Sequence, residues 1–359
     1  MRFSARLQAS DSPYALGEVR YNVDGSVDDI AWSRPQHDGP ALRALAMMDY
    51  LKLNDLDPES ANLARQVLKI DLDHLSYAYE AKGYDLWEYS FGHHFFTRLV
   101  QMRALERGIA EAPRFMRKEW RIAAASLRSE LAKHWDAKGG FYHFSLGKVT
   151  NWEGNEVPEV GAGRDASAVL AANYARFEEG SFSLNDPKLL SSAWVLEEYF
   201  RHAYPFNKDH AFAPGIGRHP DDDYYGGNAW YVLTSGYAEL YYGLAARLQS
   251  DEAGLIVSSE SEAFIESALG RAVRIGERLR PEDSLKFLAK GDGFMATMMD
   301  TLGKDATMAE QFSKEDGSGL SAADLTWSYS SFLSSALARE AVAASGVDYA
   351  SLSFDCGAK

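Results

Sequence analysis

The sequence contains a single cysteine, Cys356, so no disulfide can form within the chain. None of its asparagines begins an Asn-x-Ser/Thr glycosylation acceptor, and polar residues follow the first six where a secretory signal would have an apolar core. No apolar run approaches the length that spans a bilayer. These absences predict a cytoplasmic protein without membrane contact, unless the chain is a trimmed form of a secreted protein.

Basic residues are also few relative to acidic ones. The 37 lysines and arginines face 52 aspartates and glutamates, which gives a formal net charge of −15. Binding to nucleic acid requires a basic surface that neutralises phosphates, and anionic membranes attract basic segments in the same way. The charge therefore argues against both nucleic acid and anionic membranes as partners.

Hydrophobic residues, by contrast, make up 46% of the chain, and aromatic residues make up 13%, with 8 tryptophans and 19 tyrosines. These rings serve either a large core or a sugar site, where flat rings pack on the apolar faces of pyranoses. Composition alone favours neither use. The length of 359 residues permits one large domain or two ordinary ones. Because no low-complexity linker interrupts the chain, we expect one domain over residues 1–359.

Apolar residues recur at helical spacing through most of the chain. Period-2 strand patterns are few, and residues 140–144 form the clearest one, in a short hairpin. Long loops rich in Gly, aromatic and acidic residues cover 137–165, 207–227 and 304–319. The pattern predicts an all-α fold of helical hairpins that close into an α/α toroid, with the long loops building the site at one end. The expected helices cover 40–51, 59–81, 95–110, 114–133, 166–177, 187–204, 229–248, 260–279, 284–302 and 322–344.

Three short motifs could be taken for cofactor or metal sites, and each lacks a necessary part. Gly161-Ala162-Gly163 follows no strand and lacks the third glycine of a dinucleotide loop. His93 and His94 are adjacent and so do not share one helix face. The acidic run 221–223 lacks the alternating ligands of a calcium loop. We expect neither a cofactor nor a metal.

Two carboxylates in loops remain. Glu88 ends the run Gly83-Tyr84-Asp85-Leu86-Trp87-Glu88, and Glu310 lies in the last of the long loops. Glycoside hydrolysis needs one protonated and one ionised carboxyl, and a neighbouring tryptophan helps to keep a carboxyl protonated by desolvation. On the residues alone, an acidic residue in a loop is more often simply solvated, so both readings of this pair stay open.

Several blocks resemble glycoside hydrolase family 15, the glucoamylases, and they come in the family's order. Trp32-Ser33-Arg34-Pro35-Gln36-His37-Asp38-Gly39-Pro40 resembles the W-x-R-P-Q-x-D-G-P block, and 83–88 followed by 95–97 resembles G-Y-D-L-W-E…F-F-T. Residues 217–230 resemble G-R-Y-P-E-D-x-Y-Y-x-G-N-P-W. Residues 309–312 and 321–329 resemble A-E-Q-Y and S-A-x-D-L-T-W-S-Y.

The resemblance implies an (α/α)6 barrel of glucoamylase type, shortened at its N-terminus and without a starch-binding domain. It implies an inverting exo-α-1,4-glucosidase that releases β-glucose from the non-reducing ends of α-glucans. Glu88 would be the general acid and Glu310 the general base, with roughly 6.5–9.5 Å between their carboxyls for the attacking water. The residues expected to bind substrate are Trp32, Arg34, Asp85, Trp87, Arg218, Asp222, Trp230, Gln311 and Trp327.

Two features depart from the family pattern. Tyr89 stands where the family has a second Glu that contacts sugar, and no W-T-R-D segment precedes the first block. Two other functions therefore stay open: a related enzyme that acts on another small molecule in a biosynthetic pathway, and a catalytically weak glucan-binding remnant. We also expect one or two helices of the toroid to be missing, and self-association could cover the faces that this exposes.

Overall fold

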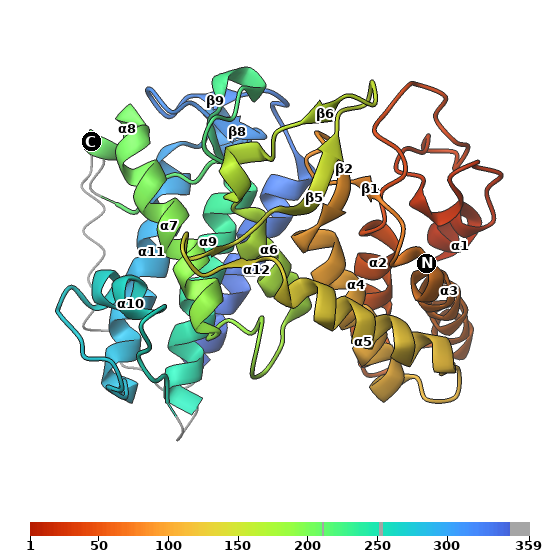
Figure 1. Cartoon of the computed structure of the whole chain (residues 1–359), viewed down its shortest axis with the longest axis horizontal. Helices are drawn as coiled ribbons and strands as arrows, with labels where there is room; N and C mark the ends of the chain where they lie inside the picture. The colour runs from red at the N-terminus through yellow and green to blue at the C-terminus, as the bar shows by residue number, and fades with distance from the viewer. Residues whose placement is uncertain (210–211, 251–253, 345–359) are drawn as a thin grey trace. The chain divides into compact units, whose positions relative to one another are not determined.

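The computed structural model describes residues 1–209, 212–250 and 254–344, so Cys356 lies outside the described residues. The chain divides into two compact units, Met1–Phe177 and Glu178–Lys359. Twelve α-helices and nine short strands form in the described residues, which confirms the predicted all-α class (Figure 1). The expected single domain stays a prediction, and each unit is described separately below.

The helices of the first unit pack in sequence-adjacent pairs. The longest of them, α3, begins where Asp57 accepts a hydrogen bond from the Ser60 N–H at 2.8 Å and Pro58 occupies the first turn. Its apolar stripe is buried against α2, and α4 in turn packs on α2, α5 and α6. The bounds are α1 Arg2–Gln8, α2 Gly39–Tyr50, α3 Pro58–Ala78, α4 Phe95–Glu111, α5 Lys118–Ala132 and α6 Ser167–Ala175.

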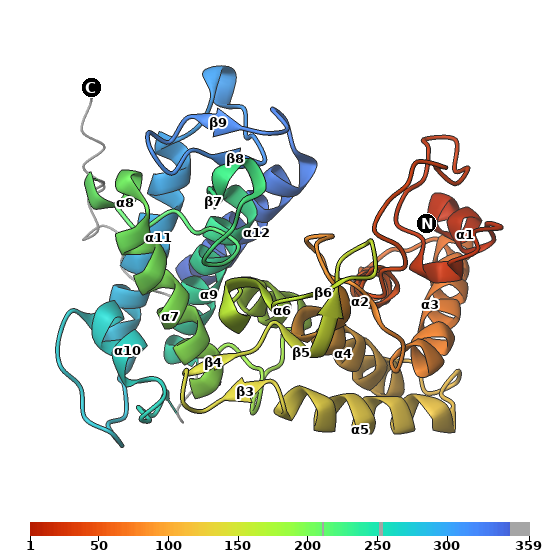
Figure 2. The same cartoon turned by 45° about the horizontal axis from the view of Figure 1, so that its top comes forward.

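Short antiparallel strands join these helices. Four of them form a sheet in the order β1-β2-β5-β6 (Figure 1), and two more form the β3–β4 pair (Figure 2). The expected strand at 140–144 is thus confirmed as the short strand β4, whereas β5 and β6 lie in the region predicted to be a loop. The bounds are β1 Gly83–Tyr84, β2 Phe91–His94, β3 Trp135–Asp136, β4 Phe141–Tyr142, β5 Ser145–Thr150 and β6 Glu156–Val157.

The second unit is built around α9, which packs against both α11 and α12. Three short strands in the order β7-β8-β9 form a separate sheet. The helices are α7 Pro187–Ala203, α8 Pro205–Asp209, α9 Tyr231–Ser250, α10 Glu262–Leu269, α11 Ser284–Asp300 and α12 Thr326–Ala344. The strands are β7 Ala229–Trp230, β8 Gln311–Phe312 and β9 Gly319–Leu320.

Four tyrosines of α9 are fully buried, and each hydroxyl has a partner on a neighbouring segment. Tyr231 donates to the Thr301 carbonyl at 2.6 Å, and Tyr237 donates to the Ala193 carbonyl at 2.9 Å. The other two donate to carboxylates, Tyr241 to Glu197 and Tyr242 to Asp292, each at 2.7 Å. A buried hydroxyl without a partner is costly, so these bonds fix how the neighbours pack around α9.

Helix boundaries differ from the prediction where local geometry or strand pairing ends the helical pattern. The helix expected over 260–279 ends at Leu269, because Gly270 adopts a left-handed conformation with φ 65° and caps it. The helix expected from 229 begins at Tyr231, since Ala229 and Trp230 pair as β7. Helices α1 and α8 were not expected.

No helix in the described part of the chain is both long and apolar enough to cross a membrane. The exposed apolar side chains on helices include Leu333 and Leu337 on α12, which are 60% and 64% exposed. Whether another copy of the chain covers such positions stays a prediction.

The carboxylate of Asp292 yields a prediction for the second unit. It is 4% exposed and accepts hydrogen bonds from Tyr242 and from the Arg339 Nε at 2.6 Å, joining α11 to α9 and α12. We expect Asp292→Ala to lower the free energy of unfolding by about 2–4 kcal/mol, because both donors lose a charged acceptor. Urea denaturation measures the change. Lys286→Ala, at an exposed position of the same helix, is the control, and equal losses in both variants would contradict the assignment.

Candidate active site

Glu88 lies on the six-residue connection between β1 and β2, whose register pairs Tyr84 with Phe91. Its backbone has φ 65°, a left-handed conformation that is uncommon for a residue with a side chain. The turn is held by a hydrogen bond from the Glu88 N–H to the Asp85 carbonyl at 2.9 Å. The side chain is exposed, so the carboxylate is displayed on an ordered loop.

The loop is organised around the carboxylate of Asp85, which is fully buried. It accepts hydrogen bonds from the Trp87 N–H at 2.7 Å, from the Ser90 N–H at 2.6 Å and from the Ser90 hydroxyl at 2.9 Å. Three donors satisfy a buried carboxylate, so Asp85 closes the loop on itself. In this structure Asp85 shapes the connection that carries Glu88, and a contact with substrate stays a prediction.

Trp87, unlike Glu88, is buried. Its indole is 8% exposed, and its N–H lies 2.9 Å from Oδ2 and 3.1 Å from Oδ1 of Asp165. Asp165 is 3% exposed and also accepts from the Ser167 N–H at the start of α6. The Glu88 loop is thereby tied to α6 through a residue that the sequence patterns did not indicate.

Three residues from the segment before α2 contact Glu88 directly. The Trp32 indole N–H donates to Oε1 at 2.6 Å, and the Gln36 side-chain amide lies 3.3 Å from the same oxygen. The Ser33 hydroxyl donates to the Glu88 backbone carbonyl at 2.8 Å. The structure thus brings the predicted residues Trp32 and Glu88 together, and it adds Ser33 and Gln36, which lie in the same sequence block.

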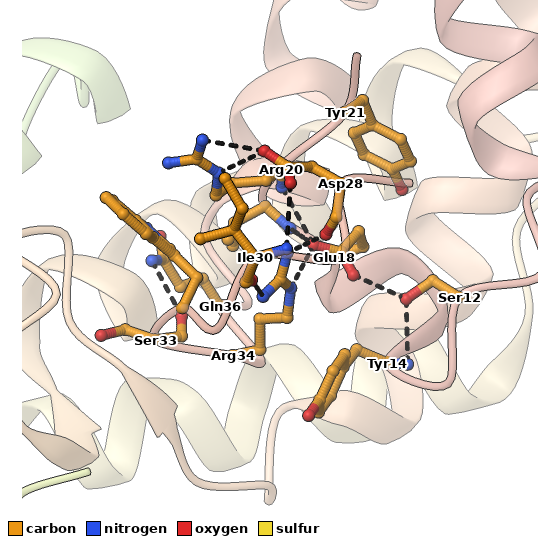
Figure 3. A network of polar contacts seen from close by, with 12 residues as sticks. Ser12, Tyr14, Glu18, Arg20, Tyr21, Asp28, Ile30, Ser33, Arg34 and Gln36 are labelled. Atoms are coloured by element: carbon orange, nitrogen blue, oxygen red, sulfur yellow. Dashed lines mark hydrogen bonds and ion pairs between the residues drawn. The ribbon is translucent and has the colours of Figure 1, made fainter. Parts of the chain in front are cut away.

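A buried ion pair fixes this segment (Figure 3). Arg34 Nε donates to Glu18 Oε1 at 2.6 Å, and the two side chains are only 6% and 1% exposed. The guanidinium also donates to the carbonyls of Ile30 and Asp28, both at 2.6 Å. Arg34 is therefore engaged inside the protein, and its predicted contact with substrate stays a prediction.

A second arginine supports Trp32 from its face. The Arg20 guanidinium carbon lies 4.1 Å from the centre of the Trp32 ring, a cation–π contact. Arg20 is itself held by Asp28, with Nε and Nη2 2.9 Å and 2.8 Å from Oδ2 (Figure 3). The indole is thus held on one side by a paired cation and at its N–H by Glu88.

Asp38, at the start of α2, is the most strongly perturbed carboxyl near this loop. Burial raises its pKa to about 6, and the negative charges of Asp85 and Glu88 add to the effect. Since Asp38 is 9% exposed, it carries a proton at mildly acidic pH and then no longer repels its two neighbours. The sequence prediction did not assign it to the site, although it belongs to the first sequence block.

Glu310 lies in the second unit, directly before β8. Its N–H donates to the Ala322 carbonyl at 2.8 Å, which sets the backbone beside β9. Its Oε2 accepts a hydrogen bond from the Ser321 hydroxyl and lies 3.4 Å from the Tyr224 hydroxyl. The side chain is half-buried, so the carboxylate is positioned by two hydroxyls and keeps access to solvent. Neither Ser321 nor Tyr224 was predicted as a site residue.

Arg218 and Asp222 form a bidentate ion pair, with Nε and Nη2 2.8 Å and 2.5 Å from the two carboxylate oxygens. Arg218 is 4% exposed, and its guanidinium carbon lies 5.0 Å from the Tyr224 ring centre and 5.3 Å from that of Trp230. The predicted residues Arg218, Asp222 and Trp230 are therefore brought together. Tyr224 links this group to Glu310.

The last two predicted residues differ in exposure. Gln311 is fully buried in β8, where Oε1 accepts from the Asn228 side-chain amide at 3.3 Å. Trp327, on the first turn of α12, is half-buried. The next residue, Ser328, donates to the Ala309 carbonyl at 2.8 Å and so ties α12 to the residue before Glu310.

The two carboxylates occupy different units, and the distance between them stays a prediction. A separate cavity of about 580 Å³ in the first unit contains none of the predicted residues. It is lined by Met48, Leu51, Lys52, Arg65, Leu68, Glu111, Ala112, Pro113, Arg114 and Phe115. No group of three or more His, Cys, Asp or Glu in the described ranges could hold a metal ion.

Comparison with known proteins places this chain among glycosidases. The model of "Glycosyl hydrolases family 15" matches residues 3–337. A probable glucoamylase from Schizosaccharomyces pombe is 31% identical over 94% of this chain and 74% of its own length. Glucoamylase 1 from Rhizopus oryzae is 30% identical over 94% of the chain, which spans only 58% of that relative.

Solved structures agree with this. The family 15 glucoamylase from Hypocrea jecorina superposes with a TM-score of 0.83 at 27% identity, over 96% of this chain and 61% of that one. The Saccharomycopsis fibuligera glucoamylase gives 0.80 at 25% identity, over 96% of this chain and 80% of its own. The predicted family resemblance and the predicted glucoamylase-type helical fold are thus confirmed.

The Glu18–Arg34 pair yields a pH-dependent prediction. Burial acts to raise the pKa of Glu18, but hydrogen bonds from the Arg20 N–H, Arg34 and Ser12 outweigh it and bring the pKa below its ordinary value of 4.5. The stabilisation of the folded state by the ionised Glu18 carboxylate is therefore fully present above a pH of about 4.5. It is lost as the pH falls through the lowered pKa. We expect Glu18→Gln to cost about 3–5 kcal/mol at pH 7.

Thermal unfolding of both proteins from pH 7 down to pH 3 measures this effect. The difference in Tm should be greatest at neutral pH and should narrow below pH about 4.5. Glu59→Gln is the matched control, since its ion pair with Arg2 is exposed and such pairs contribute about 0–1 kcal/mol. A gap that stays constant over the whole range would contradict the electrostatic origin.

Proposed function

Because the chain belongs to glycosyl hydrolase family 15, we propose that it hydrolyses α-1,4-glucans from their non-reducing ends and releases β-glucose with inversion. The observation that carries the proposal is the setting of Glu88. This carboxylate is exposed on an ordered hairpin loop and accepts a hydrogen bond from the Trp32 indole N–H at 2.6 Å. A side chain displayed in this way can reach the oxygen of a bound glycosidic link.

Glu88 is the general acid in this proposal, and Glu310 is the general base. Glu310 takes a proton from water while the water oxygen bonds to the anomeric carbon from the face opposite the leaving group. The bond from that carbon to the glycosidic oxygen breaks, and Glu88 gives its proton to this oxygen. The products are β-glucose and a glucan shortened by one unit. Solvent then removes the proton from Glu310 and returns one to Glu88.

The neighbours of each carboxylate support these roles. Trp32 and Gln36 hold one oxygen of Glu88, which leaves Oε2 to face the leaving group. Ser321 and Tyr224 both contact Oε2 of Glu310, so its Oε1 is the oxygen that would accept the proton from water. A preorganised acid and base need little rearrangement in the transition state.

A further prediction from the sequence keeps its place in the proposal. The aromatic and charged group Arg218, Asp222 and Trp230 would bind sugar hydroxyls and a ring face, although the first two already pair with each other. Tyr89, which is 43% exposed, would replace a carboxylate contact with a ring contact. Cytoplasmic localisation stays a prediction from the composition.

The proposal predicts that the protein forms β-glucose from maltoheptaose and that either carboxylate variant loses this activity. We expect Glu88→Gln and Glu310→Gln each to lower kcat by about 10²–10⁴-fold, the usual contribution of an acid or base. Proton NMR of the first product reports its anomer before mutarotation. Glu315→Gln, an exposed glutamate of the second unit, should keep full activity. Initial α-glucose would overturn inversion, and binding without any glucose would indicate a glucan-binding protein.

A second substrate separates the two roles. Fluoride leaves α-glucosyl fluoride with little need of a proton, so an acid variant should hydrolyse it far better than it hydrolyses maltoheptaose. A base variant still lacks activation of water and should fail on both substrates. We therefore expect the loss of kcat in Glu88→Gln to be at least about tenfold smaller on α-glucosyl fluoride than on maltoheptaose. In Glu310→Gln the loss of kcat should be the same on both substrates. The reverse pattern would exchange the two assignments.

A further inference from the structure

An isolated tryptophan stands at the tip of the hairpin that joins β5 to β6. Trp152 is 70% exposed, more than any other tryptophan among the described residues. No hydrogen bond or ring contact holds its indole within the described ranges. An exposed tryptophan can serve as a contact site for a ligand, because its large ring buries much apolar area when a ligand covers it.

The turn beneath Trp152 is well ordered. The Asn151 side-chain oxygen accepts hydrogen bonds from the N–H groups of Glu153 and Asn155 at 3.1 and 3.0 Å. The Gly154 N–H donates to the Asn151 carbonyl at 3.0 Å, and Gly154 has φ 82°, a conformation that glycine adopts without strain. The polar groups of the turn thus satisfy one another, and the turn presents the indole on a preorganised support.

The register of the sheet places this tip beside the Glu88 loop. Strands β2 and β5 are antiparallel, and Phe91, the first residue of β2, pairs with Thr150, the last of β5. The Glu88 loop leads into Phe91, and the hairpin turn leaves from Thr150, so both project from the same end of the sheet. Figures 1 and 2 show the two connections at that end.

Other exposed rings accompany this end of the first unit. Tyr89 follows Glu88 on the same loop and is 43% exposed, and Trp32, which donates to Glu88, is 40% exposed. Pyranose rings pack their apolar faces on such side chains while their hydroxyls stay in water. The group of three therefore suits an extended sugar chain better than a single small substrate.

We propose that Trp152 forms a further glucan-binding subsite, on which a glucose unit of the leaving chain packs. This inference rests on the proposed function, because the general acid Glu88 contacts the glycosidic oxygen of the leaving group. Residues on the adjacent turn therefore meet the part of the glucan beyond the cleaved bond. Trp152 thereby favours long glucans over disaccharides, since maltose ends before it reaches the indole.

Kinetics on two chain lengths test the subsite. In Trp152→Ala we expect kcat/KM for maltoheptaose to fall about tenfold, equivalent to about 1.4 kcal/mol, whereas kcat/KM for maltose stays within about twofold. Trp152→Phe keeps a ring and should restore most of the loss. Tyr77→Ala removes a 69% exposed ring from α3, on the surface of the same unit, and is the matched control. Equal losses on both substrates, or none on either, would overturn the subsite.

Binding distinguishes failure of the subsite from failure of the proposed function. Isothermal titration of maltoheptaose into Glu88→Gln, with and without Trp152→Ala, needs no turnover. If the wild type hydrolyses no glucan but Glu88→Gln binds maltoheptaose about tenfold more tightly than the double variant does, the subsite stands and the proposed hydrolysis fails. If hydrolysis is normal and the affinity is unchanged by Trp152→Ala, the subsite fails alone. Absence of both binding and hydrolysis overturns the two together.

Discussion

The buried ion pair between Glu18 and Arg34 is the interaction on which the end of the first unit that carries Glu88 depends. It fixes an irregular segment of about twenty residues that has no helix or sheet of its own to hold it. Arg34 binds backbone carbonyls on this segment, and Glu18 binds backbone N–H groups, so the pair replaces the missing secondary structure. Because two buried charges are stable only when paired and hydrogen-bonded, the segment has one favoured arrangement.

The same requirement organises the other parts of both units. The buried Asp85 shapes the Glu88 loop because its oxygens need donors, and the nearest donors are the backbone and hydroxyl groups of that loop. In the second unit, the buried tyrosine hydroxyls of α9 find acceptors on the surrounding segments and thereby align them. Hydrophobic burial alone would permit several packings. Because buried polar groups need hydrogen-bond partners, only the packing that supplies those partners is stable.

The two candidate catalytic residues are held differently, and the difference suits their proposed chemistry. Glu88 receives an indole N–H on an exposed loop, beside Asp38, whose pKa is raised to about 6 mainly by burial. Glu310 receives two hydroxyls and is half-buried next to a short sheet. Aromatic rings are frequent around the first, whereas the second lies near the Arg218–Asp222 pair through Tyr224. The surroundings of Glu88 thus suit its proposed role toward a sugar leaving group, and those of Glu310 suit its proposed role toward water.

Periodicity and sequence blocks by themselves determined the helical class, most helix positions, the family and the two candidate carboxylates. These features depend on residues that lie close together in the sequence, so they can be found without knowing which distant residues contact each other. Tertiary structure alone decided that Arg34 pairs with Glu18, that Trp87 contacts Asp165 and that Trp152 lies beside the Glu88 loop. Each of these pairings joins residues well separated along the chain, and it depends on which side chains the packing buries and which strands pair. A single sequence carries no direct signal of that choice, because the free energy that decides it belongs to the folded interior as a whole.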